Sequence, residues 1–135
     1  MNDLMEWLMN YALDRGIGFI ATKQLKPDTP SQSDCSQRVI VINMNWHNRH
    51  EIPFMFAHEI GHILNGDAGV HQYSASSVSI KEEHAADLTG LRLILQYCRE
   101  NNIAVYNPTQ FCECFGVPGV MENAVKYEIS TSNPD

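Results

Sequence analysis

Two histidines stand four residues apart, with a glutamate directly after the first, in the stretch FAHEIGHILNGD. On a helix, residues four apart lie on one face, so His58 and His62 would present both imidazoles to the same point. Imidazole nitrogen is a common zinc ligand. Glu59 would flank that point, placed to bind a water molecule on the metal instead of the metal itself. The pattern therefore predicts a metal centre with a base beside it.

Catalytic zinc usually has three protein ligands and one open position, so a third ligand must come from elsewhere in the chain. A histidine six residues after the second would complete one known arrangement, but Ala68 occupies that position. The stretch EEHAAD contains two acids four residues apart, which would share one helix face. We expect Glu83 to be the third ligand and Asp87 to accept the free ring N–H of His58 or His62.

The ligand set favours one Zn²⁺ per chain, although two imidazoles and a carboxylate also accept Mn, Co or Fe. His84 is an alternative ligand, but on a helix it points about 100° away from Glu83. The competing interpretation is an amphipathic helix with two partly exposed histidines, because a His-Glu-x-x-His string also arises by chance. Burying three ionisable groups unpaired in an apolar segment is costly, and a metal removes that cost.

Two helices are expected to carry these residues. Pro53 suits the first turn of a helix that ends at Asn65 and Gly66. A second long helix is expected over 81–100, with acids in its first turn, as the helix dipole favours. The residues between them, 67–80, are small and polar and are expected to form a loop.

The rest of the chain predicts a small sheet and further helices. Apolar β-branched residues predict strands at 18–22 and 38–45, separated by a Pro- and Ser-rich loop over 23–37. Other helices are expected at 3–14, from Pro108 to Gly116, and over about 119–128.

These elements predict an α+β fold. We expect a mainly helical single domain over 1–130, a two- to three-stranded sheet from 18–45, and a disordered tail at 131–135. The helix with the His-Glu-x-x-His pattern should pack against the second ligand-bearing helix.

The composition excludes several classes of function. The chain has 135 residues and a net charge of −7, with nine Lys and Arg residues scattered singly, which argues against direct binding of nucleic acid. No apolar run is long enough to cross a membrane, and the N-terminus lacks the basic region of a signal peptide. Four irregularly spaced cysteines predict free thiols in a reducing, cytoplasmic compartment.

The chain resembles the ImmA/IrrE family of metallo-endopeptidases. The similar stretches are RVIVINMN, IPFMFAHEIGHILNGD and EEHAADLTGLRLIL, which correspond to the family's apolar strand ending in Asn, its HExxH helix and its later Glu-x-x-Ala-Asn/Asp helix. This two-helix pattern is the gluzincin arrangement. Thr89 and Gly90 depart from the family, which usually has Phe and Ala there. Many relatives carry a fused helix-turn-helix domain, whereas here we expect a DNA-binding partner to be a separate protein.

The resemblance implies a zinc-dependent endopeptidase that cleaves a cognate helix-turn-helix repressor of phage or mobile-element type and so relieves repression. Glu59 would be the catalytic base. The oxyanion of the reaction needs a donor besides zinc, for which Tyr73 and His71 are candidates in the segment between the two helices. Tyr73 stands eleven residues after His62, a spacing similar to that in thermolysin-like enzymes.

Two other functions stay open. The chain could be a non-catalytic, zinc-stabilised protein-binding module that sequesters a repressor or acts in a toxin–antitoxin-like pair, although the intact Glu59 argues against this. A metal-dependent hydrolase of small molecules is the weaker alternative, because a short chain has little room for a deep pocket. No contact with a membrane is expected, and the sequence predicts no oligomeric state.

Overall fold

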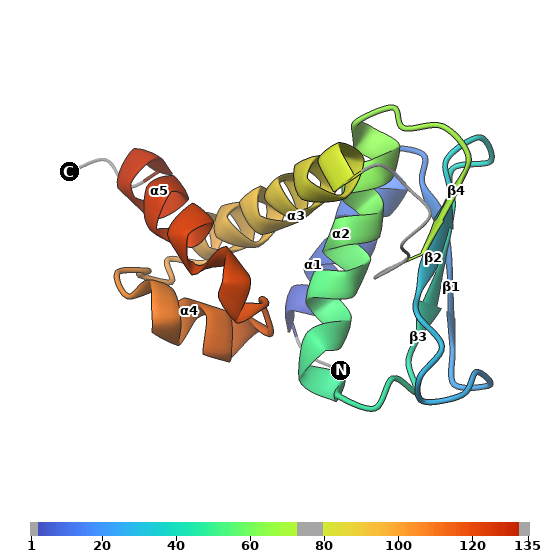
Figure 1. The fold of residues 1–135 in the computed structure, drawn as a ribbon, viewed down its shortest axis with the longest axis horizontal. Coiled ribbons are helices and arrows are strands. Elements are labelled where there is room, and N and C mark those ends of the chain that lie inside the picture. The colour runs from blue at the N-terminus through green and yellow to red at the C-terminus, as the bar shows by residue number, and fades with distance from the viewer. Residues whose placement is uncertain (1–2, 73–79, 133–135) are drawn as a thin grey trace.

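The computed structural model describes residues 3–72 and 80–132 (Figure 1). Its elements follow in the order α1 (Asp3–Asp14), β1 (Gly18–Thr22), β2 (Gln32–Asp34), β3 (Val39–Asn43), α2 (Ile52–Leu64), β4 (Val70–Gln72), α3 (Ile80–Glu100), α4 (Pro108–Phe115) and α5 (Glu122–Ser132). Short 3₁₀ turns precede α2 and α5. The fold is α+β, and α2 packs against α3, so both expectations are confirmed.

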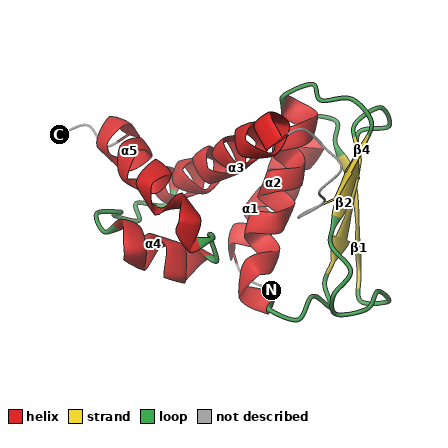
Figure 2. Cartoon of the chain, in the orientation of Figure 1, coloured by secondary structure: helices red, strands yellow, loops and turns green. Residues whose placement is uncertain are grey.

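The four strands form one mixed sheet, and the helices of the described chain lie on one side of it (Figure 2). The strand order is β1-β3-β2-β4, with β1 parallel to β3 and β2 antiparallel to both β3 and β4. Ile40 and Ile42 of β3 are fully buried in the core. Phe19 of β1 meets Phe56 of α2 edge to face, with ring centres 5.7 Å apart. These contacts fix α2 against the inner face of the sheet.

Two segments expected to be loops contain strands. The segment 23–37 includes β2, and the segment 67–80 includes β4. The sheet therefore has three strands from 18–45, as expected, and a fourth that the sequence pattern does not show. Neither short strand has an apolar alternation. Each is formed by its pairing, with Ser33 of β2 opposite Ile40 on one side and His71 on the other.

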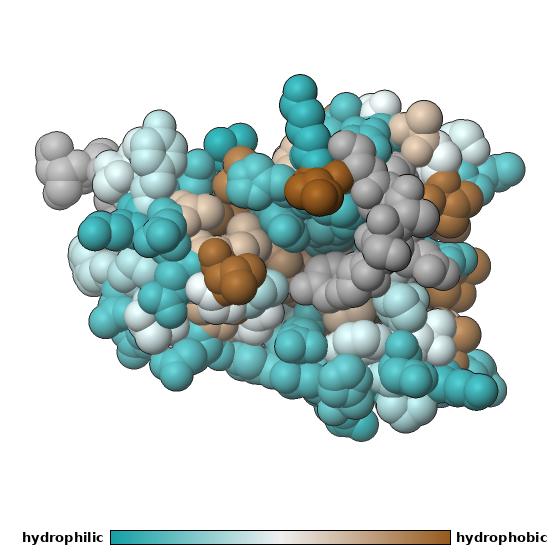
Figure 3. All heavy atoms as spheres, viewed as in Figure 1, coloured by the Kyte–Doolittle hydropathy of each residue, from teal (hydrophilic) through white to brown (hydrophobic). Residues whose placement is uncertain are grey.

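The outer face of the sheet carries exposed apolar side chains. Ile20 of β1 is 56% exposed and Val70 of β4 is 57% exposed. In the space-filling view, brown apolar groups gather along the side of the molecule where the sheet lies (Figure 3).

α2 is the central helix of the fold. Pro53 lies in its first turn, where its missing N–H costs no hydrogen bond, and Gly66 follows its end with a left-handed φ of 74°, as expected. Its residues from Ile52 to Ile63 are all buried, because the sheet, α1 and α3 cover it. The two histidines and the glutamate are therefore held in the interior, which excludes the alternative of partly exposed histidines.

Two glycines allow α2 and α3 to approach closely. A Cβ atom on Gly61 of α2 would lie 2.7 Å from the carbonyl oxygen of Ala86, and one on Gly90 of α3 would lie 3.0 Å from the backbone nitrogen of His58. Gly90 is one of the positions at which the chain departs from the ImmA/IrrE pattern. Because glycine has no side chain, α3 lies directly against the backbone of His58 at this position.

Replacing Gly61 with alanine should destabilise the protein, although alanine in a helix is ordinarily about 1 kcal/mol more favourable than glycine. The carbonyl oxygen of Ala86, 2.7 Å from the added Cβ, is part of the α3 backbone and cannot move independently of it, so the two helices must separate. We expect a loss of roughly 1–3 kcal/mol in the free energy of unfolding, measured by denaturant titration. Gly119→Ala is the control, because no atom lies within 4 Å of the Cβ it would add. Wild-type stability in Gly61→Ala would contradict this account of the helix contact.

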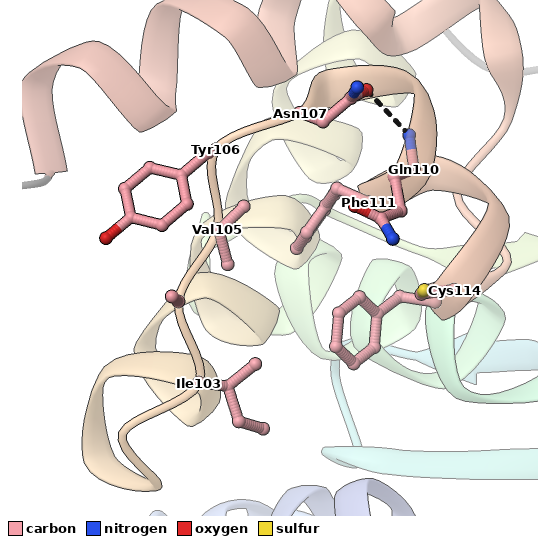
Figure 4. Close-up of a pocket in the computed structure, with 9 residues that line it drawn as sticks. Ile103, Val105, Tyr106, Asn107, Gln110, Phe111 and Cys114 are labelled. Atoms are coloured by element: carbon pink, nitrogen blue, oxygen red, sulfur yellow. Dashed lines mark hydrogen bonds between the residues drawn. The ribbon is translucent and has the colours of Figure 1, made fainter.

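The C-terminal helices form a separate part of the helical layer (Figure 1). The side chain of Asn107 caps α4 by accepting the backbone N–H of Gln110, 3.0 Å away (Figure 4). Gly116, with a left-handed φ of 66°, ends this helix as expected. α5 continues to Ser132, two residues into the segment expected to be a tail, and residues 133–135 lie outside the described part.

An apolar cavity of about 180 Å³ lies beside α4 (Figure 4). Val105 and Phe111 contribute to its wall, and Tyr106, which also lines it, is 82% exposed. It is smaller than the roughly 300–1,000 Å³ of usual ligand pockets. None of its lining residues belongs to the predicted metal centre. In the described part of the chain, no helix is both long enough and apolar enough to cross a membrane.

Candidate metal centre

His58, His62 and Glu83 meet where α2 packs against α3. Nε2 of His58 lies 2.9 Å from Oε1 of Glu83, and Nε2 of His62 lies 2.9 Å from Oε2 of the same carboxylate. One ligand atom from each residue lies within 4.8 Å of the other two. The histidines are 2% and 0% exposed, and Glu83 is half-buried. These three side chains could hold a metal ion between the two helices.

The donor set and its dimensions fit one zinc ion. Zinc bonds of about 2.0–2.1 Å in a tetrahedron hold the ligand atoms roughly 3.4 Å apart. The two 2.9 Å separations would need to widen by only about half an ångström, a small side-chain adjustment. Two imidazoles and one carboxylate leave a fourth tetrahedral position for a water molecule or substrate.

A carboxylate orients each histidine through its other ring nitrogen. Nδ1 of His58 lies 2.7 Å from Oδ1 of Asp87, and Nδ1 of His62 lies 2.9 Å from Oδ2 of Asp67. Beside an ionised carboxylate, Nδ1 carries the hydrogen and donates it, which leaves Nε2 as the nitrogen able to bind a metal. Both Nε2 atoms then face the same point, beside Glu83. Carboxylate–histidine pairs of this kind support metal sites in other proteins.

Sequence reasoning named Asp87 for one of the histidines but missed Asp67. Asp67 follows the end of α2, where Gly66 reverses the chain. The backbone N–H of Asp67 donates to the carbonyl of His62, 3.1 Å away, and this bond holds Asp67 beside the C-terminal end of α2. The signal that could have found it is an acid directly after a left-handed glycine cap, five residues beyond a ligand histidine.

Asp67→Asn and Asp87→Asn should each weaken zinc binding by about 10–100-fold, because the imidazole loses the charge that fixes its ring hydrogen and raises its basicity. The measurement is competition for zinc with a chelator of known affinity. Asp34→Asn is a matched control, since the Asp34 side chain bonds to Ser36 and Gln37 in a turn of its own. Equal zinc affinity in all three variants would show that these carboxylates do not support the site.

Glu59 is fully buried beside the three candidate ligand side chains. Its Oε1 accepts a hydrogen bond of 2.6 Å from Oγ of Ser33 on β2. Its Oε2 is also buried and has no hydrogen-bond partner among the described residues. A buried carboxylate oxygen without a partner is costly, and a bound water or ion or a chemical role would account for it. Sequence reasoning missed Ser33, because it lies in a polar segment expected to be a loop.

Burial and neighbouring charges shift two pKa values at the site. Burial alone would lower the pKa of His58, but hydrogen bonds to Asp87 and Glu83 outweigh it and raise this pKa to about 9. Burial raises the pKa of Glu59 to about 8, against the attraction of His58 and the hydrogen bond from Ser33. Without a metal, both groups hold protons at neutral pH.

The metal-free protein should therefore lose stability as the pH rises. The folded-state pKa of His58 lies above its ordinary value of 6.5, and that of Glu59 lies above its ordinary value of 4.5. The folded state therefore binds more protons than the unfolded state. The stabilisation from protonated His58 is complete at low pH and is lost as the pH rises through about 9, and the cost of ionising buried Glu59 grows as the pH rises through about 8. Zinc needs deprotonated ligands, so its binding strengthens over the same range.

We expect the difference in melting temperature between zinc-loaded and metal-free protein to widen from about pH 6 to about pH 8.5. The measurement is thermal denaturation with excess zinc or with EDTA at each pH. A difference that stays constant, or narrows, would contradict the exchange of a proton for the metal at His58.

The structure places the other residues that the sequence singled out apart from this group or outside the described part. His84 is exposed and does not belong to the His/His/Glu group. The backbone of His71 lies in β4 opposite Ser33. Tyr73 lies outside the described residues, so its role as an oxyanion donor stays a prediction, as does that of His71.

A helix with two histidines at HxxxH spacing and a glutamate from a neighbouring helix is consistent with a zincin-like site. No family model, no curated protein and no solved structure matches this chain.

Proposed function

We propose that this chain is a zinc-dependent endopeptidase, with zinc bound by His58, His62 and Glu83. The observation that carries the proposal is Glu59, fully buried next to these ligands with Oε2 lacking a partner among the described residues. A purely structural zinc site is usually closed by four protein ligands and needs no base. Here the group offers three ligands and a neighbouring carboxylate, as hydrolytic zinc sites do.

When bound, zinc would activate a water molecule and polarise the scissile carbonyl group. Glu59 accepts the proton that the water loses as its oxygen attacks the carbonyl carbon. It then returns this proton to the nitrogen of the leaving amine, as the C–N bond breaks. Asp87 and Asp67 hold the two imidazoles with Nε2 towards the ligand point throughout.

The edge of the sheet beside this group suits a peptide substrate. Among the described strands, β4 stands at the end of the sheet order and pairs with β2. Ser33 of β2 bonds to Glu59, so β4 lies one strand away from the base. An extended peptide added to this edge would pass close to the ligand group. On this proposal, Tyr73 or His71 donates to the oxyanion.

The substrate that we propose is a separate helix-turn-helix repressor of phage or mobile-element type, whose cleavage relieves repression. One support is the resemblance to the ImmA/IrrE family in the strand, the HExxH helix and the Glu83 helix. The other is the net charge of −7, which complements the basic surface of a DNA-binding protein.

The test is co-expression of the chain with each helix-turn-helix repressor of its own genome, followed by intact-mass measurement of the repressors. We expect two complementary fragments of one repressor with the wild type and none with Glu59→Gln. A repressor that is bound but left intact by both proteins would instead favour the zinc-stabilised binding module.

A further inference from the structure

The hydroxyl of Ser33 is the hydrogen-bond partner that the structure gives the Glu59 carboxylate. Oγ of Ser33 lies 2.6 Å from Oε1, and both residues are 0% exposed. They stand 26 residues apart in the sequence and belong to β2 and α2. A hydroxyl-to-carboxylate bond of this length is short and charge-assisted when the carboxylate is ionised. The contact thus ties the sheet to the helix at the proposed base.

We propose that Ser33 is a positioning residue that aims Oε2 of Glu59 at the reacting water, an inference that rests on the proposed function. A carboxylate held at one oxygen cannot turn freely about its last bond, so the direction of the other oxygen is fixed. The strand that provides the hydroxyl is itself fixed, because Ser33 pairs with Ile40 on one side and His71 on the other. Rigid elements hold a reacting group more accurately than loops do.

A neighbouring serine shows what a purely structural hydroxyl does in this fold. Ser31 is equally buried, and its Oγ accepts the backbone N–H of Asn43 at 2.9 Å. That bond satisfies a backbone N–H donor. Ser33 instead bonds to a side chain whose second oxygen has no partner among the described residues. The Ser33 bond therefore orients the Glu59 carboxylate and leaves its Oε2 available to a water molecule.

The first test compares zinc-loaded Ser33→Ala with Ser31→Ala on the peptide that the wild type cleaves. We expect Ser33→Ala to lower kcat by about 10–100-fold, with KM within about twofold, because only the aim of the base changes. Zinc affinity should stay at the wild-type value, since the Ser33 hydroxyl bonds to Glu59 and not to a ligand. Ser31→Ala should retain the wild-type kcat. Ser33→Cys keeps a weaker donor and should fall between wild type and Ser33→Ala.

The second test needs no substrate. Cobalt(II) replaces zinc, and its visible absorption bands report the surroundings of the ion, including the fourth ligand that Oε2 of Glu59 would contact. We expect Ser33→Ala to change the spectrum in the same direction as Glu59→Gln, whereas Ser31→Ala keeps the wild-type spectrum.

The two tests separate failure of this inference from failure of the proposed function. Wild-type kcat in Ser33→Ala, or a wild-type cobalt spectrum where Glu59→Gln changes it, would overturn the positioning role. A wild type that cleaves no peptide would overturn the proposed function, and the cobalt spectra would still decide whether Ser33 directs Glu59. An unchanged spectrum in Glu59→Gln itself would show that Oε2 does not contact the fourth ligand, and it would overturn the positioning role.

Discussion

Glu59→Gln should lower kcat for peptide cleavage by about 10²–10⁴-fold and leave the zinc content unchanged. The amide cannot take a proton from the attacking water, but it does not touch the ion in the proposed arrangement. Its carbonyl oxygen can still accept the hydrogen bond from Ser33, so the side chain keeps its place. The measurement is steady-state cleavage of a peptide that spans the repressor site, with metal content determined on the same samples.

The fold should tolerate this substitution, which makes the kinetic result interpretable. Burial raises the pKa of Glu59 to about 8, so its ionised form is unfavourable at this position in the metal-free protein. A neutral amide of similar volume should leave the melting temperature equal or higher, above all at alkaline pH. Glu113→Gln on the exposed surface of α4 is the matched control. Cleavage by Glu59→Gln at the wild-type rate would rule out Glu59 as the base.

Glu83→Ala should weaken zinc binding by more than about 100-fold. Loss of a carboxylate that only supports a ligand already costs about 10–100-fold, and Glu83 would bind the ion directly. Two imidazoles on one helix would remain as ligands, and the zinc ion would then have two open coordination positions instead of one. Chelator competition gives the affinity, and Glu82→Ala is the control, because Glu82 is its neighbour on α3 but outside the ligand group.

The same substitution should remove the stabilisation by zinc. Free zinc at about 100 times its dissociation constant stabilises a folded protein by about 2.7 kcal/mol, and a variant that no longer binds it gains nothing. The melting temperature of Glu83→Ala should therefore be the same with zinc as with EDTA. An equal rise in wild type and Glu83→Ala would place the zinc elsewhere on the chain.

The sequence was sufficient for the parts of the site that depend on helical spacing. His58 and His62 share a face because they are four apart on a helix with clear start and stop signals, Pro53 and Gly66. Glu83 was predictable from its place on a second long helix, whose apolar pattern is strong. These inferences needed only local periodicity and the number of ligands that a zinc ion requires.

The missed parts of the site depend on contacts that no local pattern records. Ser33 lies on a strand of three polar and small residues, which is formed by pairing with β3 and β4. Asp67 reaches His62 through a chain reversal at the end of α2. Gly90 departs from the ImmA/IrrE pattern, and the structure shows that its missing side chain lets α3 contact the backbone of His58.

The most direct test of the central claim is an anomalous difference map at the zinc absorption edge, from crystals of the protein grown with equimolar zinc. We expect one peak per chain, about 2.0–2.1 Å from Nε2 of His58, Nε2 of His62 and a carboxylate oxygen of Glu83. Crystals with no peak at these three side chains, or with zinc bound only elsewhere, would contradict the metal centre and with it the proposed peptidase.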